Sequence, residues 1–261
     1  MTIISATQMA ALQASARERT CGRLGAHVAQ HFPQGARLAG ADGVQGLARR
    51  CLQEADELRL DSDADLLRLQ SLQLFFGHAF RADVLCRPFA AILAREDVTT
   101  PRVRIARAWQ DGMQHFGRIA GDCGQHQRAA IARLAGATLR ALHADPAGID
   151  ALRAGELVAW LWPVRHAVVQ SLGADAFPDS LWQVVAVARR HGLARPGAVR
   201  VLLALAWTFG IGFDADPMLP GFAGLARALG DPAAAAGALA QADDFLARVA
   251  AAAPQPAELP S

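Results

Sequence analysis

The chain has 261 residues, of which 52% are hydrophobic and 19% are charged, and its formal net charge is +2 at pH 7. This hydrophobic fraction lets burial offset the loss of chain entropy, so the composition excludes a globally disordered protein. Lys is absent, and the Arg residues are interspersed with Asp and Glu rather than gathered in runs. A nucleic-acid groove needs a basic stripe with aromatic residues between the charges, and the sequence indicates none.

The N-terminal stretch, residues 1–22, lacks the charged start and the long apolar core of a signal peptide. No apolar run approaches the roughly 20 residues that a membrane helix needs. Cys21, Cys51, Cys86 and Cys123 are widely separated and form no CxxC motif. In a chain without an export signal, such cysteines are expected to be free, buried thiols. We therefore expect a cytoplasmic protein that does not insert into membranes.

Apolar residues recur at helical spacing along the whole chain, whereas alternating strand patterns are scarce. Ser62 followed by Asp65 resembles a capping box, and Pro101 suits the first turn of a helix. These signals predict an all-α fold of about ten helices with no sheet. In chain order, the predicted helices lie near residues 9–28, 44–58, 66–76, 101–116, 131–142, 149–172, 180–191, 196–209, 221–229 and 232–252.

Two segments of the chain resemble each other at an offset of 133 residues. The first, LRLQSLQLFFGHAFRADVLCRPFAAIL, begins at Leu67, and the second, RVLLALAWTFGIGFDADPMLPGFAGLA, begins at Arg200. Composition explains matched leucines, but it explains poorly a shared Phe-Gly pair followed at equal spacing by Phe, Asp and Phe. The aligned pairs are Phe76 with Phe209, Gly77 with Gly210, Phe80 with Phe213, Asp83 with Asp216, and Phe89 with Phe222.

This similarity predicts a tandem duplication that gives two related helical bundles. The expected organisation is a first helical unit over residues 1–118 and a connecting helix or linker over 119–148. A second helical unit follows over 149–252, and the Pro-rich tail 253–261 is expected to be disordered.

The second copy of the repeat contains the densest group of special residues, FGIGFDADPMLP at 209–220. As a calcium site it offers two carboxylates, Asp214 and Asp216, and no closing Glu, and as an acid–base pair it would need a cleft. A helix corner explains more of its residues. Gly210 would end one helix in a left-handed conformation, and Asp216 would cap a following turn that begins at Pro217.

Other combinations of reactive residue types are weaker. His27 and His31 have the i, i+4 spacing of helix-borne zinc ligands, but the Glu of HExxH and a third ligand are missing. Cys123 and His126 lie in a Gly-bounded segment, where a loop between helices is the simpler interpretation than a nucleophile pair. We therefore expect no catalytic residue, no metal and no cofactor.

Tryptophans are concentrated in the second half of the chain, at Trp160, Trp162, Trp182 and Trp207. Helical spacing makes most of them candidates for the core. An exposed subset would instead suit a protein-binding surface, because Trp is enriched among the residues that dominate interface energetics.

The pattern FGxxFDxDPxLP at 209–220 resembles a group of small bacterial helical proteins that are encoded beside type VI secretion effector and spike genes. The N-terminal stretch MAALQASARERTCGRLGAHVAQHFP and the RRHGL turn at 189–193 are also similar to that group. The resemblance implies an accessory role, such as an adaptor or co-chaperone for effector loading, and it implies no catalytic residues. The first copy departs from the pattern at Val84 and Arg87, in place of Pro217 and Pro220.

The sequence therefore favours a protein-interaction module whose partner is an effector, spike or adaptor of a secretion system. One alternative is an immunity protein that neutralises a neighbouring toxin, and another is an enzyme or small-ligand binder that uses the histidine or aspartate pairs. The residues expected to form the structural or interaction motif are Phe209, Gly210, Phe213, Asp216, Pro217 and Pro220, with first-copy counterparts Phe76, Gly77, Phe80 and Asp83.

Overall fold

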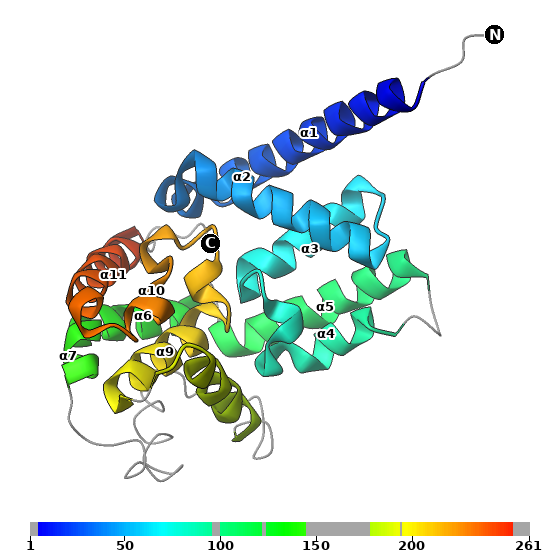
Figure 1. Ribbon diagram of the computed structural model, residues 1–261. Helices are drawn as coiled ribbons and strands as arrows, with labels where there is room; N and C mark the ends of the chain where they lie inside the picture. The colour runs from blue at the N-terminus through cyan, green and yellow to red at the C-terminus, as the bar shows by residue number, and fades with distance from the viewer. Residues whose placement is uncertain (1–4, 96–99, 122–123, 145–177, 194, 253–261) are drawn as a thin grey trace.

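The computed structural model describes residues 5–95, 100–121, 124–144, 178–193 and 195–252 (Figure 1). All regular elements within these ranges are helices, so the all-α prediction is confirmed. No helix in the described ranges combines the length and the apolar character that a membrane crossing needs. The predicted helix at 149–172, two of the tryptophans, Cys123 and the tail at 253–261 lie outside the described residues.

The first half of the chain folds as a hairpin of two long helices laid over a layer of shorter ones (Figure 1). The Ser62 hydroxyl accepts a hydrogen bond from the Asp65 backbone N–H at 3.2 Å, so the predicted cap is present. Within α2, Gly40 has φ of 70° and ψ of 175°, which kinks the helix. The helices are α1 (Ala6–His31), α2 (Pro33–Leu58), α3 (Asp63–Phe76), α4 (Arg87–Leu93) and α5 (Pro101–Ala120).

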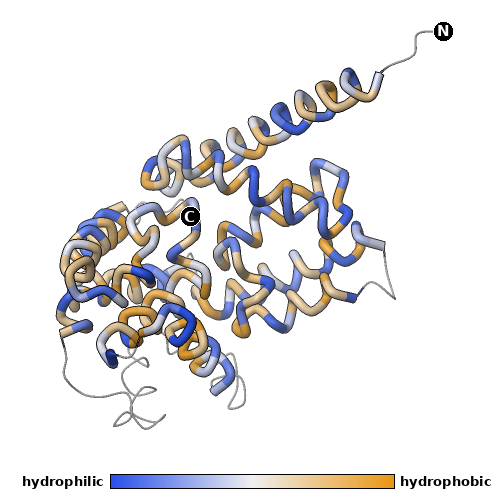
Figure 2. The backbone as a smooth tube through the Cα atoms, viewed as in Figure 1, coloured by the Kyte–Doolittle hydropathy of each residue, from blue (hydrophilic) through white to orange (hydrophobic). Residues whose placement is uncertain are grey.

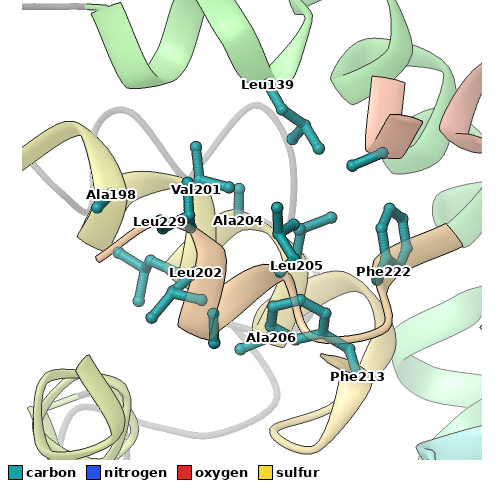
Figure 3. Close-up of a cluster of buried hydrophobic side chains, with 14 of the residues drawn as sticks. Leu139, Ala198, Val201, Leu202, Ala204, Leu205, Ala206, Phe213, Phe222 and Leu229 are labelled. Carbon is teal, nitrogen blue, oxygen red and sulfur yellow. The ribbon is translucent and has the colours of Figure 1, made fainter. Parts of the chain in front are cut away.

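The second half is built around α9 (Pro196–Phe209), whose residues from Gly197 to Thr208 are all buried. Figure 3 shows the apolar cluster that α9 forms with side chains such as Leu139, Phe213 and Phe222. The other helices are α6 (Gln125–Ala137), α7 (Leu139–Ala144), a helix over residues 178–190, α10 (Leu225–Ala228) and α11 (Pro232–Ala252).

The segment predicted to connect the two halves, 119–148, contributes to the second core. Ile131 and Leu134 of α6 and Leu139 of α7 are buried in the same apolar cluster as α9. Figure 2 shows hydrophobic and hydrophilic residues interspersed along the helices of both halves. A separate small cluster of Val28, Val44 and Leu47 joins α1 and α2.

The helix predicted at 221–229 is shorter than expected. Pro220–Phe222 forms a 3-10 turn, and only Leu225–Ala228 is α-helical. Gly224 lies between the 3-10 turn and the α-helix and has φ of 70°. Its backbone N–H donates a hydrogen bond to the Asp214 carbonyl at 3.1 Å. A hydrogen bond to a preceding loop, rather than to the helix, ends the regular pattern here.

The hairpin that leads into α3 and the one that leads into α9 have the same backbone geometry at an offset of 133 residues. The N–H of Leu60 donates to the Ala55 carbonyl at 2.9 Å, and the N–H of Leu193 donates to the Ala188 carbonyl at 2.9 Å. Both connections turn through a residue with positive φ, which is Arg59 at 57° in the first half and Gly192 at 67° in the second. Only the second of these two turns has the glycine that this conformation favours.

This difference predicts opposite effects of matched substitutions on the free energy of unfolding. Arg59 is exposed, so Arg59→Gly removes strain without removing packing and is expected to stabilise the protein by about 0.5–1 kcal/mol. Gly192 has open space around it, so Gly192→Ala adds only backbone strain and is expected to destabilise by about 1 kcal/mol. Urea unfolding measures both changes, and destabilisation by Arg59→Gly would contradict this explanation of the two turns.

Candidate functional site

Each of the two repeated segments ends its helix at a glycine in a conformation that other residues avoid. Gly77 follows α3 with φ of 85° and ψ of 155°, and Gly210 follows α9 with φ of 94° and ψ of 159°. The sequence predicted a left-handed helical residue at Gly210. The structure has positive φ there but an extended ψ, a region that is essentially restricted to glycine.

The two glycines also lie against each other's helix end. A Cβ atom on Gly77 would lie 2.8 Å from the carbonyl oxygen of Phe209, and one on Gly210 would collide with the carbonyl oxygen of Phe76. Glycine is therefore required twice over, by the backbone conformation and by the close approach of the opposite chain segment. This contact brings the ends of α3 and α9 face to face.

After each glycine, a short 3-10 turn leads to an aspartate that caps the next few residues of the chain. The turns are Phe80–Ala82 and Phe213–Ala215. The first carboxylate oxygen of Asp83 accepts from the Leu85 backbone N–H at 2.9 Å. Asp216 accepts from the Met218 backbone N–H at 2.9 Å in the same way. Each aspartate thus fixes the conformation of its own corner.

The second oxygen of each aspartate reaches into the opposite half of the molecule. Asp83 Oδ2 accepts from the Ile211 backbone N–H at 3.1 Å, and Asp216 Oδ2 accepts from the His78 backbone N–H at 3.1 Å. Both aspartates are buried, with exposed fractions of 4% and 6%. We call this reciprocal arrangement of Gly77, His78, Asp83, Gly210, Ile211 and Asp216 the corner clasp.

Residues 78 and 211 occupy equivalent positions of the corner clasp but differ in type. The His78 ring nitrogen Nδ1 lies 3.4 Å from Asp216 Oδ2, so this carboxylate faces an imidazole as well as backbone donors. The equivalent position facing Asp83 is occupied by Ile211, which has no ring. Backbone N–H groups that point at a buried carboxylate form charge-assisted hydrogen bonds, which are stronger than neutral ones.

Aromatic rings anchor each corner to its own core in a matching pattern. Phe89 is fully buried, and its ring centroid lies 4.7 Å from Phe76 and 6.1 Å from Phe80. Phe222 is fully buried in the second half, at 5.3 Å from Phe209 and 5.9 Å from Phe213. The aromatic residues of the predicted motif therefore hold the corners in place from behind.

Three positions at which the two similar segments differ, Val84, Arg87 and Pro217, face helices of the opposite half. In the first corner, the Val84 N–H donates to Gln183 Oε1 at 3.0 Å, and Arg87 forms an exposed ion pair with Asp179 at 3.0 Å. In the second corner, Pro217 has no N–H and packs against α2. The first corner therefore contacts the opposite half through polar groups, and the second corner contacts it through close packing.

Two glycines of α2 make the close packing of Pro217 possible. A Cβ atom on Gly46 would lie 2.9 Å from Pro217 Cβ, and one on Gly43 would collide with the Pro217 carbonyl oxygen. Both glycines lie on one face of the helix, three residues apart. Neither was identified from the sequence, although small residues at this spacing are a signal for close approach between chain segments.

Beside this contact, the second corner borders an apolar groove of about 450 Å³ that we call the junction groove. Met218 and Leu219 of the second corner form one wall, and Pro220 is exposed nearby. The start of α2 and the last turns of α11 form the other sides. Its lining residues are His31, Phe32, Pro33, Gln34, Gly35, Leu38, Leu74, Met218, Leu219, Phe245 and Val249.

The histidine pair of α1 lies close together, with a distance of 4.5 Å between the ring centroids of His27 and His31. Burial and the neighbouring His31 lower the pKa of His27. In the described part of the chain, no group of three or more metal-ligating side chains surrounds this pair or any other.

The thiols of Cys21, Cys51 and Cys86 are free and buried, as predicted for these three residues. Burial raises the pKa of all three thiols, and the pKa of Cys51 reaches about 12. Because the thiolate is the reactive form, these cysteines are poor nucleophiles. Their role is to fill the first core.

The remaining candidate residues lie apart from one another. Asp214 is half-buried, and its carbonyl oxygen accepts a hydrogen bond from Gly224, while both carboxylate oxygens of Asp216 accept backbone N–H groups. Trp207 is buried in the second core, whereas 62% of the Trp182 surface is exposed. The aspartate pair thus has a structural use, and Trp182 is the most exposed large apolar residue in the described part of the chain.

The reciprocal geometry predicts that Asp83→Ala and Asp216→Ala destabilise the protein to a similar extent. Each change leaves two backbone N–H groups without their acceptor, which is expected to cost about 1–3 kcal/mol. Amide hydrogen exchange gives the sharper measurement. Exchange should accelerate first at Ile211 in Asp83→Ala and first at His78 in Asp216→Ala. Asp231→Ala, which removes only an exposed local contact to Ala233, is the control and should affect neither amide.

A second prediction concerns His115, which is 4% exposed and packs against the rings of Phe76 and Phe89. Burial and the nearby Arg118 lower its pKa below 6.5. The unfolded chain therefore binds a proton at a pH at which the folded protein does not. Proton binding by the unfolded chain lowers the free energy of unfolding. The stability that neutral His115 provides is therefore complete above pH 6.5 and is lost as the pH falls through 6.5 towards the lowered pKa.

The melting temperature is therefore expected to decrease as the pH is lowered from about 7.5 to 5.5. His115→Gln should make this dependence on pH less steep. Comparing each variant with itself at the higher pH removes any effect of the substitution on packing. Equal slopes in both proteins would show that His115 does not carry the pH dependence.

No protein-family model matches the chain, and neither the curated proteins nor the solved structures contain a match to it. A proposal for its function therefore depends on the residues and surfaces described above.

Proposed function

We propose that the chain is a non-enzymatic protein-interaction module that acts in the bacterial cytoplasm as an adaptor or co-chaperone for a type VI secretion effector or spike protein. The observation that carries the proposal is the junction groove, an apolar channel of about 450 Å³ beside the second corner. The segment that carries the family resemblance, 209–220, supplies Met218 and Leu219 to its wall, and Leu219 is one of the residues that the resembling pattern specifies.

The chemistry of the junction groove supports a helical or extended peptide segment as its occupant. Its walls are largely aliphatic and aromatic, and Met218 has an unbranched side chain that adapts to different partners. An amphipathic helix buries its apolar face in grooves of this kind. Arg248 lies above Phe245 at 5.3 Å from the ring centroid and is exposed, so an acidic residue beside the apolar face would find a cation at the rim.

The use of the aspartates in the corner clasp favours binding over catalysis. Both carboxylate oxygens of Asp216 accept hydrogen bonds from backbone N–H groups, so Asp216 is not free to act as a base or a cation ligand. The rigid corner that results presents Met218 and Leu219 at a fixed position. Pre-organised surfaces bind with a smaller loss of conformational entropy.

The same proposal takes the two halves as copies of one ancestral unit. Support comes from the shared backbone conformations at Gly77 and Gly210, the reciprocal bonds of Asp83 and Asp216, and the matching 14-residue helices α3 and α9. The junction groove lies beside the second corner, so the two copies would have different roles in binding.

The test is co-expression of the tagged full chain with type VI effector and spike proteins from its own host. The unmodified chain should capture one of them. Val249→Asp and Leu38→Asp, two half-buried positions of the junction groove, should reduce capture at least tenfold while retaining cooperative thermal unfolding. Val103→Asp, an exposed apolar position on α5, is the matched control and should bind normally.

Two outcomes would overturn the adaptor proposal. One is the absence of capture of any of these proteins under secreting conditions. The other is protection of cells from a co-expressed toxin, abolished by Val249→Asp, which would establish an immunity protein instead.

A further inference from the structure

The first half of α1 projects from the body of the protein (Figure 1). Every residue from Ala6 to Arg19 is exposed, and the first buried residue of the helix is Cys21. Two large apolar side chains lie on this arm, Met9 with an exposed fraction of 44% and Leu12 with 57%. The arm therefore presents apolar surface that no described part of the chain covers.

The start of the arm is stabilised by its own cap. The Ser5 backbone N–H donates to Gln8 Oε1 at 2.9 Å, and the Gln8 backbone N–H donates to Ser5 Oγ at 3.2 Å. This reciprocal pair is a capping box, which favours a helical start without help from the body. The exposed end is thus built as a regular helix.

One face of α1 continues from the arm onto the body. Residues spaced three or four apart lie on the same side of a helix. Along this face the arm contributes the apolar residues, and the later turns border a pocket of about 250 Å³ between α1 and α3. In order, the residues of this face are Met9, Leu12, Ala16, Thr20, Arg23 and His27.

The pocket between α1 and α3 is apolar at its base. Leu24 of α1 and Leu66 and Leu67 of α3 line it, and the ion pair of Arg23 with Asp63, at 2.8 Å, lies at its exposed edge. We call it the α1–α3 pocket. Its apolar base suits apolar side chains such as those of Met9 and Leu12.

We propose that two copies of this chain pair in antiparallel orientation through α1, and that each inserts Met9 and Leu12 into the α1–α3 pocket of the other. A two-fold axis at the level of Glu18 places Met9 opposite His27 and Leu12 opposite Leu24. Met9 and His27 are about 27 Å apart along one helix, from the rise of about 1.5 Å per residue. The projecting residues and the pocket thus have matching positions about one axis.

This geometry selects a second copy of the chain over another partner. A two-fold interface requires a surface that is complementary to itself, with a projection and a recess on the same patch. The exposed face of α1 has both, and a single rotation fills both recesses. The junction groove is formed by other residues, so this pairing does not depend on the proposed function.

Sedimentation velocity of the full chain across a range of concentrations tests the pairing. The chain mass is 27.6 kDa, and the unmodified protein should sediment with about twice that mass at high concentration. Leu12→Glu and Met9→Glu should each weaken dimerisation at least tenfold. Ala14→Glu is the matched control, because it adds the same charge to the opposite side of the arm and should leave the dimer intact.

Mixing two variants tests the contact itself. Leu67→Arg should also weaken the dimer, and a mixture of Leu67→Arg with Leu12→Glu should recover it, because the introduced charges attract across one contact while the other contact is unaltered. A monomeric unmodified protein would overturn the proposal. A dimer that survives Leu12→Glu and Met9→Glu would overturn it as well, since the interface would then lie elsewhere.

Discussion

Two buried carboxylates hold the molecule together by each accepting one N–H group from its own corner and one from the other half. Asp83 and Asp216 thereby use their two oxygens in the same way, and neither half completes its own corner alone. A buried carboxylate is costly unless charge-assisted hydrogen bonds compensate it. If one half unfolded, the aspartate of the other half would lose one of its N–H donors. The two halves are therefore expected to unfold together rather than as separate domains.

The rest of the architecture follows from bringing two helix ends face to face. Gly77 and Gly210 let the chain segments approach, and the rings behind them keep the ends of α3 and α9 in position. Around this centre, each half docks onto the other with its own chemistry. The first corner contacts the second half through a hydrogen bond from the Val84 N–H to Gln183. The second corner contacts α2 through the packing of Pro217 against two glycines.

Sequence patterns predicted most of the local features of this fold. Helical spacing predicted the all-α class, and the bounds of α9 and α11 agree with those expected from Pro196, Gly210 and Pro232. These features depend on neighbouring residues, so a single sequence contains their signals. The helix predicted at 221–229 is shorter in the structure because the Gly224 N–H donates to a preceding loop, which no local pattern reveals.

The candidate functional surface was predictable only in part. The sequence identified the corner and the capping role of Asp216, but not its second bond to His78 or the groove beside Met218. Both features arise from residues that lie far apart in the chain. The offset of 133 residues contained an indirect signal, because a repeated Asp in two equivalent corners is what a reciprocal contact requires.

The contact of Pro217 with Gly43 and Gly46 has a consequence for the shape of the junction groove. Because glycines face Pro217 across this contact, the spacing between α2 and the second corner is set by the close approach of their backbones. Met218 and Leu219 follow directly, so the width of the junction groove depends on Gly43 and Gly46, which do not line it. A single methyl group added at Gly43 or Gly46 would therefore change the width of the groove while leaving the identity of its lining residues unchanged.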